Sequence, residues 1–120
     1  MLFTSDIPTH FTKVFTRWTA TLPQAIGLND WLTKLDGTAS PLRDITLGGT
    51  QLKFGTVCVP HDCGQNVAGL LFTPNDDRIV ALVKLSSVNG APTTMLIGQM
   101  TNPEASCLQR LLEDNLLAAC

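Results

Sequence analysis

The sequence predicts an α+β protein: a central antiparallel sheet of about five strands, with helices packed on one face and a protruding disulfide-closed loop. Three observations lead to this prediction. Apolar residues recur at helical spacing near both ends of the chain, and short runs bounded by turn residues fill the middle. Two cysteines, Cys58 and Cys63, stand between two of those runs. Sequential strands flanked by helices favour a meandering antiparallel sheet.

An N-terminal helix is expected from about Thr9, a candidate N-cap, to Thr21, and Pro23 helps to end it. A short turn of helix should follow around Trp31. The expected buried face of the first helix consists of apolar residues at helical spacing, namely Phe11, Val14, Phe15, Trp18 and Leu22. The plain interpretation of Phe15, Trp18 and Trp31 is core packing.

From Arg43 onward the pattern indicates strands. The expected strands are Asp44–Leu47, Gln51–Cys58, Asn66–Phe72, Arg78–Leu85 and Thr93–Gly98. Gly48-Gly49 predicts a tight hairpin turn between the first two strands, and Ser86–Pro92 is expected to be a turn region.

A C-terminal helix is expected to open at Asn102-Pro103-Glu104. Asn102 is the candidate cap, Pro103 fits the first helical position, and Glu104 lies favourably at the positive end of the helix. The expected buried stripe is Leu108, Leu111, Leu112 and Leu116.

Size and composition exclude several classes of function. A chain of 120 residues that is 44% hydrophobic and 15% charged supports one ordered core and argues against disorder. Its lysines and arginines are scattered and the net charge is −2, so nucleic-acid binding is not expected. No apolar run is long enough for membrane insertion. The N-terminus lacks signal-peptide features, yet four cysteines suit an oxidising compartment. Either the protein is cytosolic, or its signal peptide is absent from this sequence, and the cysteines favour the second alternative.

The run Cys58-Val59-Pro60-His61-Asp62-Cys63 is the most informative stretch. A bridge between its two cysteines requires the chain to turn back, and Pro60 restricts both itself and Val59. The expected result is a rigid hairpin connection, closed at its neck by the disulfide, with His61 and Asp62 near its tip. Rigid display of a few polar groups suits binding in a cleft, because little ordering cost remains.

Other interpretations of these residues stay open. The disulfide could be a plain staple for the hairpin, although so short a loop gains only about 2 kcal/mol. Cys58, His61 and Cys63 could ligate a metal, but zinc sites usually spread ligand pairs along the chain, and His10 is far away in sequence. A cysteine nucleophile lacks an evident orienting group. We expect neither a metal, a cofactor nor enzymatic activity.

A second cysteine pair, Cys107 and Cys120, lies in and after the final helix. On one straight helix the two would be about 20 Å apart, so a bond between them requires the tail to fold back. Its plain interpretation is a tie between the tail and the helix.

The loop sequence resembles the signature loop of the Ivy family, the bacterial inhibitors of vertebrate (C-type) lysozyme, which reads Cys-Lys-Pro-His-Asp-Cys in the founding member. Thr46-Leu47-Gly48, Gly64 and Trp31 with the stretches after them are similar as well. The likeness extends from about Trp31 to Gly98. Val59 departs from the family pattern, because it replaces the lysine.

The resemblance implies a periplasmic or secreted inhibitor, with one lysozyme-inhibitor-like domain over residues 1–120. The loop would enter the active-site cleft of C-type lysozyme, where His61 would hydrogen-bond the catalytic carboxylates and Asp62 would make neighbouring contacts. Cys58–Cys63 would hold the loop in shape. Family members form homodimers, which leaves oligomerisation open here. The alternative is a periplasmic binding or immunity-type protein that uses the same loop against a different cell-wall hydrolase.

Overall fold

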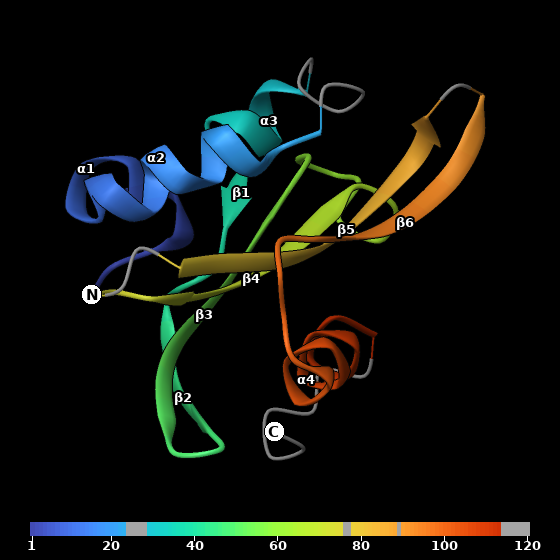
Figure 1. Cartoon of the computed structure of the whole chain (residues 1–120). Helices are drawn as coiled ribbons and strands as arrows, with labels where there is room; N and C mark the ends of the chain where they lie inside the picture. Colours follow the sequence, from blue (N-terminus) through green and yellow to red (C-terminus); the bar gives the residue numbers. More distant parts are fainter. Residues whose placement is uncertain (24–28, 76–77, 89, 114–120) are drawn as a thin grey trace.

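The computed structural model of the chain describes residues 1–23, 29–75, 78–88 and 90–113. Within these residues it confirms the α+β class, with one antiparallel sheet whose main path runs β1-β3-β4-β5-β6 (Figure 1). The strands are β1 (Thr38–Ala39), β2 (Arg43–Leu47), β3 (Thr50–Cys58), β4 (Val67–Thr73), β5 (Arg78–Val88) and β6 (Ala91–Ile97). From β2 onward each strand pairs with the next, which is the expected meander.

Strands β1 and β2 both pair with β3. β2 lies along its first half, and β1 lies at its end, where Thr38 is opposite Cys58. Between β1 and β2, Ser40 keeps the chain attached to β3. Its N–H donates to the Thr56 carbonyl, and its Oγ accepts from the Thr56 N–H. The end of β3 that leads into the cysteine loop is thus held by neighbours on both sides.

The predicted hairpin turn between β2 and β3 is confirmed. Gly48 and Gly49 have φ values of 58° and 82°, in the left-handed region that glycine enters without a side-chain clash. Two consecutive residues of this kind match the twist of a two-residue hairpin.

Three helices, α1 (Ile7–His10), α2 (Thr12–Thr21) and α3 (Asp30–Thr33), pack on one face of the sheet after a 3₁₀ turn, η1 (Thr4–Asp6). Trp18 is fully buried, and its indole N–H donates to the carbonyl of Leu32 at 2.9 Å, which joins α2 to α3. Phe15 and Trp31 are half-buried against the same apolar cluster. Core packing of all three aromatic residues is therefore confirmed.

The expected continuous helix Thr9–Thr21 is wrong in its first turn. Thr9 lies inside α1 rather than at an N-cap, and the chain leaves helical geometry at Phe11, with φ −131° and ψ 62°. The break turns the ring of Phe11 toward the sheet, where it meets Phe72 of β4 edge-on with ring centroids 5.1 Å apart. An aromatic pair of this geometry stabilises the packing beyond its buried area.

The helices cover both faces of the sheet, not one as expected. Helix α4 (Asn102–Glu113) packs on the face opposite α1–α3 (Figure 1). Its Leu108 and Leu111 contact a second apolar cluster that contains Leu52 of β3 and Leu82 of β5. The physical reason is visible in β4, whose residues are all buried: a strand apolar on both sides requires a cover on both sides.

The N-terminus of α4 begins one residue earlier than predicted. Asn102 is already helical, and Thr101 supplies the cap: its Oγ1 accepts from the Glu104 N–H, while Glu104 accepts from the Thr101 N–H at 2.8 Å. This reciprocal arrangement is a capping box, which satisfies two backbone donors at once. Leu116, expected in the buried stripe, lies outside the described residues.

Strands β5 and β6 are longer than expected. The supposed turn region Ser86–Pro92 is largely strand, because β5 continues to Val88 and β6 begins at Ala91. Gly90 takes a positive φ between them. Pro92 is tolerated because β6 is an edge strand, where one N–H is not needed for pairing.

Candidate functional site

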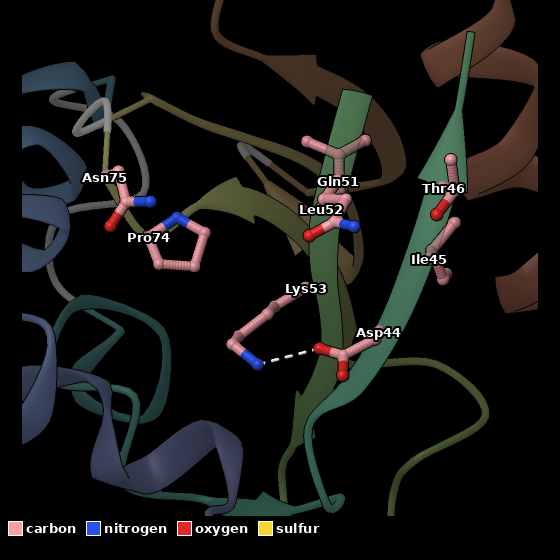
Figure 2. A pocket seen from close by; sticks show the side chains of 8 residues that line it. All are labelled: Asp44, Ile45, Thr46, Gln51, Leu52, Lys53, Pro74 and Asn75. Atoms are coloured by element: carbon pink, nitrogen blue, oxygen red, sulfur yellow. Dashed lines mark hydrogen bonds and ion pairs between the residues drawn. The ribbon is translucent and has the colours of Figure 1, made fainter. Parts of the chain in front are cut away.

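One hollow, of about 290 Å³, lies beside the β2–β3 hairpin and the turn after β4 (Figure 2). Lys53 and Asp44 form an ion pair at its rim, with Nζ and Oδ1 2.7 Å apart. Lys53 is five residues from Cys58 along β3, about 17 Å in a strand. The hollow is therefore at the other end of β3 from the cysteine loop, and nothing in it resembles a reactive constellation.

The cysteine loop joins β3 to β4, as predicted. Its neck is closed by strand pairing: Cys58 lies opposite Val67, and the Val59 N–H donates to the Asn66 carbonyl at 3.1 Å. The disulfide between Cys58 and Cys63 closes the loop between the two strands, as expected. The backbone pairing of β3 with β4 holds the neck of the loop as well.

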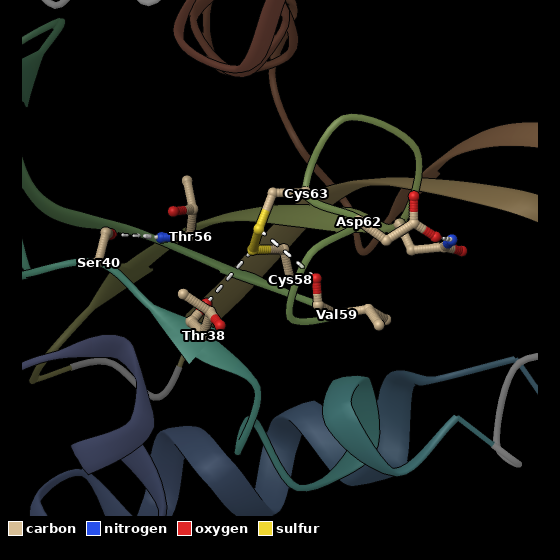
Figure 3. The surroundings of a disulfide bond; sticks show 8 residues. Thr38, Ser40, Thr56, Cys58, Val59, Asp62 and Cys63 are labelled. Atoms are coloured by element: carbon tan, nitrogen blue, oxygen red, sulfur yellow. Dashed lines mark hydrogen bonds between the residues drawn. A yellow bond between two sulfur atoms is a disulfide. The ribbon is translucent and has the colours of Figure 1, made fainter.

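Cys58 and Cys63 form a disulfide with Cα atoms 5.0 Å apart (Figure 3). Cys58 is buried at the end of β3, whereas Cys63 is exposed. The Cys58 sulfur lies 3.6 Å from the Thr38 carbonyl oxygen, so the fixed end of the bridge rests on β1. Since the two sulfurs bind each other, neither is available as a thiolate, and the metal and nucleophile interpretations lose their ligands and their nucleophile.

The first half of the loop is a β-turn over Val59–Asp62, closed by the Asp62 N–H, which donates to the Val59 carbonyl at 2.9 Å. Pro60 occupies the second position, where its fixed φ is favourable. His61 occupies the third position with φ 67°. Proline followed by a residue of positive φ is the pattern of a type II turn, in which the third residue is usually glycine or asparagine.

His61 is exposed at this turn, in a left-handed conformation that costs an L-residue about 1 kcal/mol. Within the described part of the chain, its ring has no hydrogen-bond partner. Both ring nitrogens therefore remain available to an external group. The prediction that the turn presents an imidazole outward agrees with this geometry.

Asp62 holds the loop together. Besides closing the first turn, its carbonyl accepts from the Gln65 and Asn66 N–H groups at 3.2 and 2.9 Å, which forms a second turn. Its carboxylate Oδ2 accepts from the Asn66 side-chain amide at 2.6 Å. Asp62 is half-buried rather than fully displayed, and sequence reasoning missed Asn66, whose only signal is a short polar side chain four residues after Asp62.

The remaining sequence-predicted residues lie in two places. Val59 is half-buried in the first turn, beside exposed Pro60. Cys107 is buried on α4, at the far face of the sheet. Cys120 lies outside the described residues, so its pairing with Cys107 stays a prediction.

The fold and the loop define a class of protein: an antiparallel sheet covered on both faces, with a disulfide-closed connection that carries an exposed imidazole. A sequence model of one family, described as inhibitor of vertebrate lysozyme (Ivy), matches residues 13–102. This segment contains the whole sheet and the loop. The chain belongs to the Ivy family.

A curated relative agrees with this assignment without naming an activity. An uncharacterized protein of Yersinia pestis is 38% identical over 64 residues, which are 53% of this chain and 41% of the relative. The aligned part is thus less than half of that protein's length. In the part of the chain that the structure describes, helices are too short or too polar to cross a bilayer.

Proposed function

We propose that this protein inhibits C-type lysozyme by inserting the loop Cys58–Cys63 into the active-site cleft, with His61 against the catalytic carboxylates. The observation that carries the proposal is the exposed imidazole, held at the third position of a disulfide-tied turn in a chain of the Ivy family. On this proposal the protein acts by binding, without a reaction of its own and without a cofactor or metal.

The chemistry of the target explains why an imidazole is suitable. A retaining glycosidase works through two carboxyl groups about 5 Å apart, one protonated and one ionised. An imidazole has two ring nitrogens on opposite sides, so one ring can interact with both groups and exclude the sugar. The rigidity of the loop adds to affinity, because the ordering cost is met during folding rather than during binding.

The other loop residues have supporting roles. Cys58 and Cys63 keep the turn closed, and Pro60 fixes the dihedral that precedes His61. Asp62 contributes through the loop-internal hydrogen bonds described above, and its second carboxylate oxygen is the part that neighbouring partner contacts would use. Val59 brings no charge to the rim, so the contacts of the family lysine are not expected here.

The proposed setting follows from the chemistry of the bridge. A disulfide persists in an oxidising compartment, which supports a periplasmic location for the protein. One domain over residues 1–120 would suffice for the function, since the loop and its supporting strands are contiguous in sequence. The proposed mechanism of inhibition is the same for a monomer and for a homodimer.

The test is a lysis assay with C-type lysozyme and purified protein. We expect inhibition that is lost on reduction of the disulfide and in His61→Ala. The matched control is His10→Ala, which removes the other histidine, an exposed residue of helix α1, and should inhibit like the wild type.

Two results would count against the proposal. Unchanged inhibition in His61→Ala would exclude the imidazole as the blocking group. Failure of the wild type to inhibit C-type lysozyme, together with inhibition of a bacterial cell-wall hydrolase, would favour the immunity-type alternative.

A further inference from the structure

The side chain of Asn66 connects the loop to strand β5. Its amide Nδ2 donates to Asp62 Oδ2 at 2.6 Å and lies 3.0 Å from Ser86 Oγ. Its amide oxygen accepts from the Ser86 backbone N–H at 3.0 Å. One side chain thus bridges a carboxylate of the loop and a backbone donor of the sheet.

The partners on either side require an amide. The Asp62 carboxylate can only accept, whereas the Ser86 backbone N–H can only donate, so the bridging side chain must donate on one side and accept on the other. Asparagine satisfies both, and these partners also fix which end of its amide points where. An aspartate at position 66 would place two carboxylates against each other, and an alanine would leave both partners unmatched.

The position of Ser86 explains why the sheet needs this bridge. The ladder between β4 and β5 ends at the pair Val67–Lys84, so the N–H of Ser86 lies beyond the last strand partner on that side. The Asn66 side chain takes the place of the missing backbone acceptor. The hydrogen bond therefore extends the pairing of β4 with β5 by one step. It also attaches the loop to β5.

Among the residues that the structure describes, the second turn of the loop borders open space rather than a packed core. The segment Gly64–Gln65 borders an open hollow of about 360 Å³, whose other walls come from the β5–β6 hairpin, including Ser86 and Thr93. With an open hollow beside it, the second turn of the loop depends on its hydrogen bonds for its position.

We propose that Asn66 is the positioning residue of the inhibitory loop: through Asp62 and Ser86 it locks the turn that carries His61 onto strand β5. We call these three residues the loop clamp. This inference rests on the proposed function for its consequence in lysozyme inhibition, but the clamp itself belongs to the free protein. The disulfide ties the loop to β3 and the clamp ties it to β5, so each restrains a different side.

The test is a charge swap across the clamp. Asn66→Asp alone sets two carboxylates together and should disrupt the clamp. Combining it with Asp62→Asn reverses the donor and the acceptor between positions 62 and 66 and leaves the Ser86 N–H with an acceptor, so every hydrogen bond can form again. The matched control is Asn75→Asp, which makes the same change on an exposed residue just after β4.

Two quantities are measured for each variant: affinity for C-type lysozyme, and hydrogen-exchange protection of the Asp62 and Asn66 backbone amides in the free protein. Asn66→Asp should weaken binding about 10- to 100-fold at pH 7 and lose protection. It should recover partly at pH 5, because a proton shared between the carboxylates removes their repulsion. The other titratable groups near the clamp, His61 in the loop and Lys84 on β5, are the same in all variants.

The swapped double variant should regain wild-type hydrogen-exchange protection in the free protein and bind more tightly than Asn66→Asp. Its binding stays below that of the wild type, because the Asp62 carboxylate that would contact the partner is lost, and Asn75→Asp should change neither quantity. Wild-type affinity in Asn66→Asp, or a double variant whose backbone amides are as poorly protected as those of the single one, would overturn the proposal. If the wild type itself fails to bind lysozyme, the proposed function fails, and the exchange data decide separately whether the clamp holds the loop.

Discussion

Gly37 lies directly against the carbonyl of Cys58. A Cβ on Gly37 would collide with that oxygen and approach the Val57 side chain, and the oxygen belongs to backbone that cannot rotate away. Because Cys58 ends β3 and starts the disulfide, the close approach of Gly37 fixes the base of the loop from a position far away in sequence. Gly37 thus helps to set the direction in which the cysteine loop leaves β3.

Gly37→Ala should therefore weaken lysozyme inhibition as well as stability. The collision forces a shift of the Cys58 backbone, and overpacking of this kind costs about 1–3 kcal/mol. Gly64→Ala is the matched control, because among the described residues no heavy atom outside its two chain neighbours lies within 4 Å of its Cβ position. Inhibition constants and thermal midpoints measure both effects; an Ala variant at 37 that inhibits normally would show that the base of the loop tolerates movement.

Two substitutions of His61 separate the backbone from the imidazole. Both His61→Ala and His61→Gly remove the ring and should lose inhibition. They should differ in stability, because alanine keeps the left-handed strain at φ 67° while glycine relieves about 1 kcal/mol of it. Urea unfolding should find the Gly variant at least as stable as the Ala variant. A clearly less stable Gly variant would mean that the turn is not strained at this residue.

The ion pair between Arg78 and Glu104 makes stability depend on acid pH. Hydrogen bonding from the Arg78 guanidinium holds the pKa of the buried Glu104 carboxyl at about 2, below its ordinary 4.5, against the opposing effect of burial. Since the folded state binds this proton less tightly than the unfolded chain, the stabilisation is complete above about pH 4.5. It is lost as the pH falls from there toward 2.

Glu104→Gln should therefore lower the free energy of unfolding by about 2 kcal/mol at pH 7, where it weakens the tie between β5 and α4. The difference from the wild type should shrink between pH 4.5 and 2.5. Asp44→Asn is the control, because its ion pair with Lys53 is exposed and worth little. Urea titrations at several pH values test this, and a difference that does not vary with pH would contradict the assigned pKa.

Features set by local chemistry were predictable from the sequence. The Gly48-Gly49 turn was correct because two adjacent glycines supply the dihedrals a tight hairpin needs, and the strands on either side follow from their composition. The capping box of α4 also has a signal in the sequence, because Thr101 and Glu104 have the required spacing of three residues. The sequence nevertheless favours Asn102 as the cap, because Pro103 also fits the first helical position.

Features set by long-range contacts were not predictable. The break at Phe11 depends on contact with Phe72, which is far away in sequence. Helical cover on the second face of the sheet depends on the face against which α4 packs. The local signal for that second cover is the nearly continuous apolar sequence of β4, all of whose residues are buried. In the site, the display of His61 followed from Cys58, Cys63 and Pro60, whereas the clamp through Ser86 required the register of β5 against β4.

The most direct test of the central claim is a double-mutant cycle across the complex. Affinity is measured for the wild type and His61→Ala, each against normal C-type lysozyme and against lysozyme whose catalytic carboxylates are changed to amides. If the imidazole lies between those carboxylates, the two changes should couple by about 1.5 kcal/mol or more. A coupling energy near zero, with tight binding retained, would contradict the placement of His61 in the catalytic centre.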